Sequence, residues 1–122
     1  MKSWFFVFIG GGAGSLLRYA TAKIFEDFKL LGGFPLATFL ANMLSSFIIG
    51  ILLRYMHKSA PDNSLWLFLA VGFCGGFSTF STFSLESFRM IQNGQWLLFS
   101  SYILLSIIFG IIMIFLGYQK IL

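Results

Sequence analysis

Charged residues are scarce in this sequence of 122 residues: only 10% are Asp, Glu, Lys or Arg, while 58% are hydrophobic. A soluble domain of this size needs far more charge on its surface. The composition therefore excludes a soluble globular domain and predicts an integral membrane protein. Because a helix needs about 20 apolar residues to cross a bilayer core of about 30 Å, the length allows at most four spans with short connections.

Cysteine and histidine each occur once, as Cys74 and His57. A single cysteine cannot form an internal disulfide, and the histidine has no second metal ligand near it in the sequence. No base, nucleophile and orienting residue converge at membrane depth, so we do not expect an enzyme. The net charge of +4 is typical of basic residues that flank membrane spans. We therefore expect membrane lipid as a partner, and neither nucleic acid nor a soluble protein.

Four apolar stretches predict an all-α membrane protein with one transmembrane domain over residues 1–122. The expected spans are about 4–25, 35–55, 65–91 and 96–118. The first stretch also resembles a secretory signal peptide, but glycines interrupt it and Arg18 lies where a cleavage region is usually neutral. The third stretch is longer than one straight crossing needs. This excess predicts a broken third helix, with Gly75-Gly76 inside the break.

Polar and small residues recur at every fourth position on the second and fourth spans. The two tracks are Thr38, Asn42, Ser46 and Gly50, and Tyr102, Ser106 and Gly110. Each track lies on one helix face, which must point at protein or water instead of lipid. The carboxamide of Asn42 either holds the bundle together through an interhelical hydrogen bond or donates its N–H groups to a passing ion.

The stretch from Gly72 to Ser84 mixes glycines, hydroxyls and phenylalanines at membrane depth. Phe80 and Phe83 are three residues apart and share a helix face, which is typical of plain packing. A second interpretation is that their ring edges, which carry the positive part of the ring quadrupole, coordinate a small anion beside hydroxyl donors. Such weak ligands suit a pore, because a permeating ion must also leave.

Basic residues divide evenly between the two membrane faces that four spans create. One face carries Lys2, Arg54, Lys58 and Lys120, and the other carries Arg18, Lys23, Lys29 and Arg89. Since asymmetry of Lys and Arg orients most membrane proteins, this chain has almost no orienting signal. We therefore expect dual topology and an antiparallel homodimer whose two-fold axis lies in the membrane plane.

Three motifs together resemble the CrcB/Fluc family of fluoride channels: residues 72–83, the run Gly11-Gly12-Ala13-Gly14 that leads to Arg18-Tyr19, and Asn42. The similarity covers all four expected spans. It implies a fluoride-selective channel in the inner membrane of a prokaryote, which lowers cytoplasmic fluoride by passive conduction. It also implies an antiparallel homodimer with two pores, each lined by both subunits.

By position, the resemblance implies a role for single residues in the fluoride pore. Asn42 would be the amide donor and Phe80 and Phe83 the pore phenylalanines. The remaining pore hydroxyls would be those of Thr82, Tyr102 and Ser106.

The resemblance also implies a structural Na⁺ at the dimer centre, held by main-chain carbonyls of Gly75 and Ser78 from each subunit. The sequence departs from the family at Ser78, where a threonine is expected, and at Gly110, where a hydroxyl residue is often found. The serine at position 78 matters little, because the expected ligand there is the main-chain carbonyl and not the side chain. The second departure leaves the far end of the span-four track undecided.

Two charged residues lie near the ends of the expected pathway, in what would be its vestibule. Arg18 either reaches the lipid headgroups or attracts an anion toward a pore mouth. Glu86 follows Thr82 by one turn and either orients that threonine, caps a hydrogen-bond network, or is a surface acid at headgroup level.

A small four-helix multidrug exporter of dual topology is the alternative function. Such a protein needs an intramembrane carboxylate to exchange protons for a cationic drug. The first span contains no acid, and Glu86 is the only acid within reach of any span. A purely structural subunit is a third class, but it leaves the amide and hydroxyl tracks without a purpose.

Overall fold

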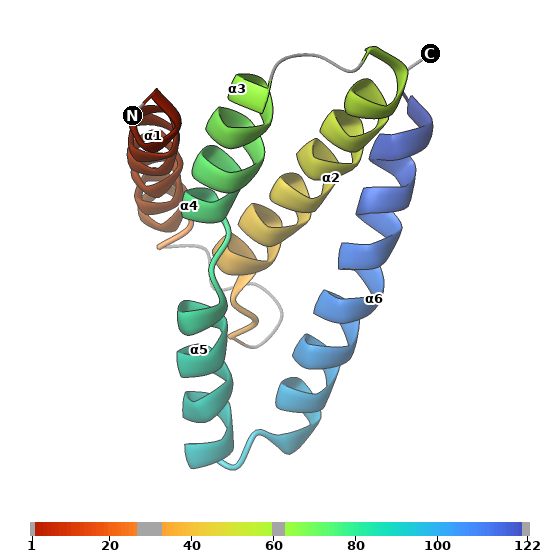
Figure 1. Cartoon of the computed structure of the whole chain (residues 1–122). Helices are drawn as coiled ribbons and strands as arrows, with labels where there is room; N and C mark the ends of the chain where they lie inside the picture. The colour runs from red at the N-terminus through yellow and green to blue at the C-terminus, as the bar shows by residue number, and fades with distance from the viewer. Residues whose placement is uncertain (1, 27–32, 60–62, 121–122) are drawn as a thin grey trace.

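The structure is a computed structural model that describes residues 2–26, 33–59 and 63–120. Across these ranges the regular structure is helical (Figure 1), so the all-α prediction is confirmed. Lys29, which enters the charge balance, lies outside the described residues. The helices are α1 (Lys2–Ile24), α2 (Leu36–Ser59), α3 (Asn63–Trp66), the π-helix η1 (Leu67–Cys74), α4 (Gly75–Phe77), α5 (Phe80–Gln92) and α6 (Trp96–Lys120).

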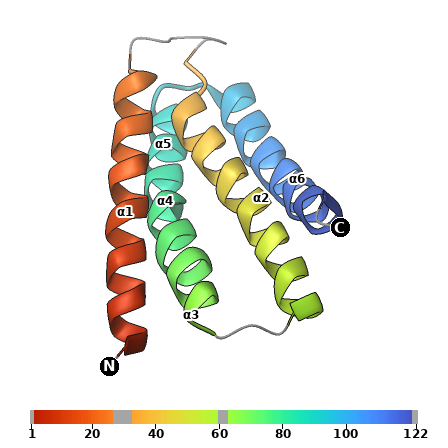
Figure 2. The ribbon, with the colours of Figure 1, turned by 90° about the horizontal axis from the view of Figure 1, so that it is seen from above.

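Three stretches of the described chain are long and apolar enough to cross a membrane, namely Leu36–Ser59, Asn63–Gln92 and Trp96–Gln119. The chain is therefore an integral membrane protein. With 23 residues, α1 has a similar length. Its glycines and Arg18 lower its mean hydropathy below that of the other three. Figure 2 shows α1 running beside the segment formed by α3, η1 and α4.

The third apolar stretch is interrupted at Ser78 and Thr79, which have extended backbone with φ/ψ of −80°/158° and −155°/125°. Figure 1 shows α5 starting as a separate helix below α4. Gly75 and Gly76 belong to α4 and are helical. The expectation of non-helical backbone at the glycine pair is therefore wrong, because the interruption comes at the following Ser-Thr pair.

Hydroxyl side chains explain why the backbone leaves the helix at Ser78 and Thr79. The Ser78 hydroxyl donates to the Cys74 carbonyl over 2.6 Å. The Thr79 hydroxyl caps α5 by accepting a hydrogen bond of 3.2 Å from the Thr82 amide. Serine and threonine compete with the helical backbone for its partners and favour N-cap positions.

Glycines form a seam between α1 and the segment of η1 and α4; we call Gly10, Gly14, Gly72 and Gly76 the glycine seam. A Cβ on Gly10 would overlap the Phe68 carbonyl oxygen, and one on Gly14 would overlap that of Phe73. Only glycine lets two backbones approach so closely. Gly10 and Gly14 are four residues apart and share one face of α1, which places both in the seam, and the seam explains why Gly75-Gly76 remains helical.

A second close approach joins α2 to α6, which lie side by side in Figure 1. A Cβ on Gly50 would overlap the Ile114 carbonyl oxygen, and one on Gly117 would overlap that of Phe47. Gly94, with φ of 72°, makes the tight turn between α5 and α6. These contacts fix α2, α5 and α6 around the space between them.

Large apolar side chains cover the outside of α6. Exposed fractions reach 84% at Leu97 and 64% at Phe115. Only 6% of the most apolar part of this helix is buried within the chain. Such a surface is stable only against lipid or against another apolar protein surface.

Candidate functional site

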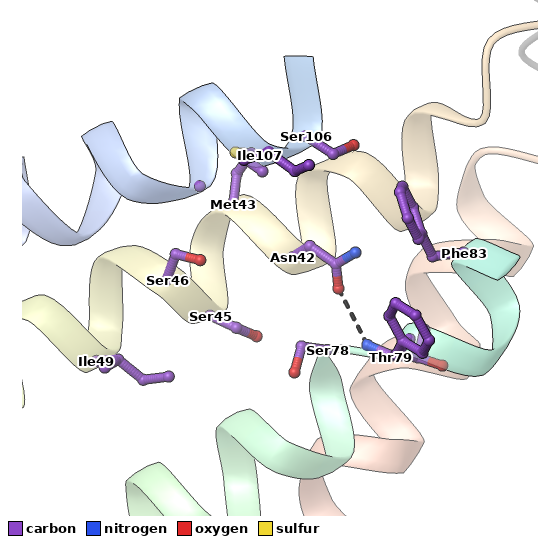
Figure 3. Close-up of a pocket in the computed structure, with 12 residues that line it drawn as sticks. Asn42, Met43, Ser45, Ser46, Ile49, Ser78, Thr79, Phe83, Ser106 and Ile107 are labelled. Carbon is purple, nitrogen blue, oxygen red and sulfur yellow. Dashed lines mark hydrogen bonds between the residues drawn. The ribbon is translucent and has the colours of Figure 1, made fainter. Parts of the chain in front are cut away.

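A cavity of about 360 Å³ lies between α2, the extended residues, the start of α5, and α6. Four of the predicted pore residues line it: Asn42, Phe80, Phe83 and Ser106. Figure 3 shows these and the other lining residues, which are Met43, Ser45, Ser46, Ile49, Ser78, Thr79, Ile107 and Gly110. The structure therefore brings residues of three separate spans to one space.

Asn42 has a fixed amide orientation at this cavity. Its Oδ1 accepts a hydrogen bond of 3.0 Å from the Thr79 amide, shown as the dashed line in Figure 3. Because an N–H group can only donate, the accepting atom must be the oxygen. The amide nitrogen then points away from Thr79, and among the described residues no acceptor engages it. The interhelical hydrogen bond of Asn42 is therefore confirmed. Its N–H groups have no acceptor among the described residues, and their role as donors to an ion stays a prediction.

Two buried hydroxyls at the same cavity have no partner among the described residues: those of Ser45 and Ser106. Leaving a buried hydroxyl unpaired costs about 1–3 kcal/mol. Ser106 is predicted from the four-residue spacing of the polar track on α6. Ser45 was missed, because it is three residues from Asn42 and so falls off the track of every fourth residue. Helical spacing of three marks the same face and is the signal that finds it.

The two phenylalanines differ in their surroundings. Their ring centroids are 6.1 Å apart with an interplanar angle of 38°. Phe83 packs on the Tyr102 ring, with centroids 4.8 Å apart. Phe80 is 80% exposed, although it lines the cavity. One ring is therefore held by the chain, while the other has an open face.

Tyr102 lies behind the cavity wall and is fully buried, with 0% exposure. Its hydroxyl donates to Glu86 Oε1 over 2.9 Å. The other carboxylate oxygen of Glu86 accepts from the Thr38 hydroxyl over 2.8 Å. Of the three roles considered for Glu86, the geometry matches the capping of a hydrogen-bond network. The hydroxyl of Tyr102 is engaged there and does not reach the cavity.

Arg18 and Thr82 line a separate space of about 230 Å³ between α1, α2 and α5. The Arg18 Nε donates to the Gly76 carbonyl over 3.0 Å, which ties α1 to α4. Thr79 lines both spaces, so they adjoin at the interruption. Arg18 therefore lines a space that adjoins the Asn42 cavity at Thr79, and Thr82 lines this second space and not the cavity.

The carbonyls of Gly75 and Ser78 fit the cation role that the sequence implies. In a continuous helix, Gly75 would bond the Thr79 amide, but this amide is bonded to Asn42. Ser78 would bond the Thr82 amide, which is bonded to the Thr79 hydroxyl. Both carbonyl oxygens are thereby released from helical hydrogen bonds, and such freed carbonyls can coordinate a sodium ion. In the described residues no cluster of His, Cys, Asp and Glu offers a competing metal site.

Comparison with known proteins gives a full-length match. Residues 5–118 match the family described as CrcB-like protein, Camphor Resistance (CrcB). A fluoride-specific ion channel FluC of Azobacteroides pseudotrichonymphae is 42% identical over 119 residues, which cover 97% of this chain and 94% of the relative. The protein of the same name from Pyrococcus abyssi is 40% identical, with 97% and 94% covered. That from Leptospira interrogans is 42% identical, with 95% and 91% covered.

Proposed function

This chain belongs to the CrcB-like family, and we propose that it is a fluoride-selective channel that conducts the ion passively out of the cell. The resemblance inferred from the sequence motifs is thereby confirmed, and the family is one of channels and not of enzymes. The observation that carries the proposal is the cavity, where N–H and O–H groups without acceptors meet phenylalanine rings.

An ion that only accepts hydrogen bonds is the guest that this cavity fits. Asn42 offers its amide N–H groups and Ser106 its hydroxyl, while the ring edges of Phe80 and Phe83 add weak positive potential. Among the residues that the structure describes, no Lys or Arg lines the cavity. Neutral donors replace part of the hydration shell without holding the anion too firmly to be released.

We further propose that two antiparallel copies form the channel, with one pathway on each side of the dimer. The 80% exposure of Phe80 supports this, since a cavity-lining ring needs a cover at membrane depth. The even charge balance permits insertion in both directions. A volume of about 360 Å³ also exceeds what one ion needs, so a second copy has room to contribute to the wall.

A structural Na⁺ belongs to the same proposal. In an antiparallel pair, the carbonyls of Gly75 and Ser78 from both copies would face each other at the two-fold axis. Bound there, the ion would offset the cost of leaving these carbonyls unpaired. Its role is to hold the interrupted segments together, while the anion passes at Asn42.

The proposed setting is the inner membrane of a prokaryote, with α1 as a fourth span. The relatives come from bacteria and an archaeon. A negative-inside potential drives an anion outward with about 2.3 kcal/mol per charge per 100 mV, so no energy-coupling domain is needed. A proton-coupled exporter has less support, because both oxygens of its one candidate acid, Glu86, are engaged by hydroxyl donors.

The decisive test is efflux from liposomes that contain the purified protein, measured with fluoride and chloride electrodes. We expect rapid fluoride efflux and chloride efflux close to that of empty liposomes. Equal rates for both ions, or no fluoride efflux, would overturn the channel proposal. Replacing Na⁺ with a large organic cation during purification tests the cation site through the fraction of dimer on size exclusion.

A further inference from the structure

The facing helices α2 and α6 carry polar or small residues at three successive levels. Thr38 and Tyr102 form the first level and are engaged by Glu86. Asn42 and Ser106 form the second, and both line the cavity. At the third level α6 contributes only Gly110, whose missing Cβ would lie 3.8 Å from Met43 Cε and 3.9 Å from the Ser46 hydroxyl. Between these two helices, a side-chain hydrogen-bond donor at this level therefore comes from α2.

Two serines of α2 line the cavity at this level, Ser45 and Ser46, and Ser45 is the one whose hydroxyl is buried without a partner among the described residues. It lines the cavity, is 1% exposed, and its Oγ has no partner in the part of the chain that the structure describes. Figure 3 shows the hydroxyl on the side of α2 that faces Ser78. Rising about 1.5 Å per residue, the helix places it about 4.5 Å along the axis from Asn42.

Other hydroxyls of this protein show what a serine without a guest does. Ser87 donates to the Phe83 carbonyl over 2.8 Å, Ser78 to Cys74 over 2.6 Å, and Thr21 to Leu17 over 2.8 Å. Each engages the carbonyl four residues earlier, which is the usual way to satisfy a hydroxyl in an apolar helix. Ser45 does not do so. The Ser45 hydroxyl is therefore buried at the cavity wall without the intrahelical bond that the other three hydroxyls make.

From this we infer that the third level, at Ser45, also binds the anion, one helical turn beyond the level of Asn42. Its ligand is a small monovalent anion that accepts hydrogen bonds, which is fluoride if the proposed function holds; the inference rests on that function. The Ser45 hydroxyl donates to the ion as it leaves the Asn42 amide. Two weak levels a few ångströms apart let an ion advance without a single deep binding site.

Three variants test this inference in reconstituted liposomes. Ser45→Ala removes the donor, Ser45→Thr keeps it, and Ser87→Ala removes a buried hydroxyl that is already satisfied within its own helix. We expect fluoride efflux to fall about tenfold in Ser45→Ala, equivalent to about 1.4 kcal/mol. It should stay near the unmodified rate in Ser87→Ala, and Ser45→Thr should conduct faster than Ser45→Ala because it keeps the donor. The fluoride concentration at half-maximal efflux should rise only in Ser45→Ala.

Thermal stability in detergent separates this role from a structural one. Removing an unpaired buried hydroxyl is neutral or stabilising when it has no guest. We therefore expect Ser45→Ala to keep its dimer and its melting temperature while losing efflux. Unchanged efflux in Ser45→Ala, an equal loss in Ser87→Ala, or a loss that follows dissociation of the dimer would overturn the inference. Failure of the unmodified protein to conduct would instead overturn the proposed function.

Discussion

On one side of the interruption at Ser78 and Thr79, η1 and α4 meet α1 through their backbones; on the other side, α5 meets α2 and α6 through side chains. The glycine seam leaves no space for even one methyl group at Gly10 or Gly14. The cavity beside Asn42 holds about 360 Å³. Tight packing and an open cavity that carries the Asn42 amide are thus separated by two residues of extended chain.

This difference shows how a chain with few polar residues keeps some of them available for an ion. Backbone contacts across the glycine seam fix α1, η1 and α4 without using any polar side chain. Only the Arg18 bond to Gly76 adds a side-chain contact between α1 and α4 among the described hydrogen bonds. Asn42 then needs to supply only its oxygen to position Thr79, and its N–H groups remain free to donate.

The largest effect is expected from filling the glycine seam. Gly14→Leu should abolish the monodisperse folded protein, because its Cβ overlaps the Phe73 carbonyl and crowds the Phe77 amide. Overpacking against backbone costs about 3 kcal/mol or more, since neither helix can move its main chain cheaply. Size exclusion in detergent measures the folded fraction.

Gly12→Leu is the matched control, two residues away on the same helix. A Cβ there meets nothing within 4 Å. This variant should give the folded yield of the unmodified protein. Equal losses in both variants would mean that α1 tolerates no leucine for reasons unrelated to the seam.

The next effect concerns the phenylalanines on the polar side of the interruption. Phe80→Ile and Phe83→Ile should each reduce fluoride efflux to that of empty liposomes, because an aliphatic side chain has no positive ring edge. Phe88→Ile is the control, since Phe88 lies on α5, is 55% exposed and does not line the cavity. Both pore variants should still elute as the dimer. Efflux that survives in them would assign these rings to packing.

Asn42→Asp should have a smaller effect on fluoride efflux, and it removes the donor groups while it keeps the acceptor. The carboxylate still accepts the Thr79 hydrogen bond, so the interruption keeps its geometry. The donor groups are replaced by a negative charge that repels the ion. Loss of one hydrogen bond to a charged group, worth about 1.5–3 kcal/mol, predicts a fall in efflux of about 10-fold to 150-fold. If efflux falls while the melting temperature is unchanged, the role of Asn42 as a donor to the ion is separate from its hydrogen bond with Thr79. Unchanged efflux would contradict the donor role.

The sequence alone predicts the helical class and much of the cavity, because helical spacing is a local property. Asn42 and Ser106 were found from their spacing of four, and both line the cavity. Phe80 and Phe83 were found from their spacing of three and also line it. Spacing along the sequence cannot show whether the polar end of a side chain reaches the cavity or lies behind its wall. Tyr102 fits its track, yet its hydroxyl reaches Glu86 behind the wall.

The interruption lies at Ser78 and Thr79, and not at the glycine pair as predicted, because of packing between helices. Glycine has a low helix propensity, which favours a break at Gly75-Gly76. The Gly76 position, however, is where α4 approaches α1 so closely that a Cβ would overlap the Gly11 carbonyl oxygen. Packing between these helices therefore overrides the local preference. Side chains then take the place of two helical acceptors: Asn42 Oδ1 accepts from the Thr79 amide and the Thr79 hydroxyl from the Thr82 amide, and the helix ends there instead.

The smallest effect, at Gly110, tests whether a glycine on the cavity side differs from a glycine in a close helix contact. Gly110→Ala should raise stability by about 1 kcal/mol, because alanine favours the helix and its Cβ would sit at ordinary distances of 3.8 Å and 3.9 Å from Met43 and Ser46. Gly117→Ala, on the same helix, should instead destabilise, since its Cβ overlaps the Phe47 carbonyl. Melting temperatures in detergent should therefore shift in opposite directions.

If Gly110→Ala conducts at the unmodified rate, the third level depends on α2 and not on α6. A stable variant with reduced efflux would mean that the ion needs the space that Gly110 leaves open.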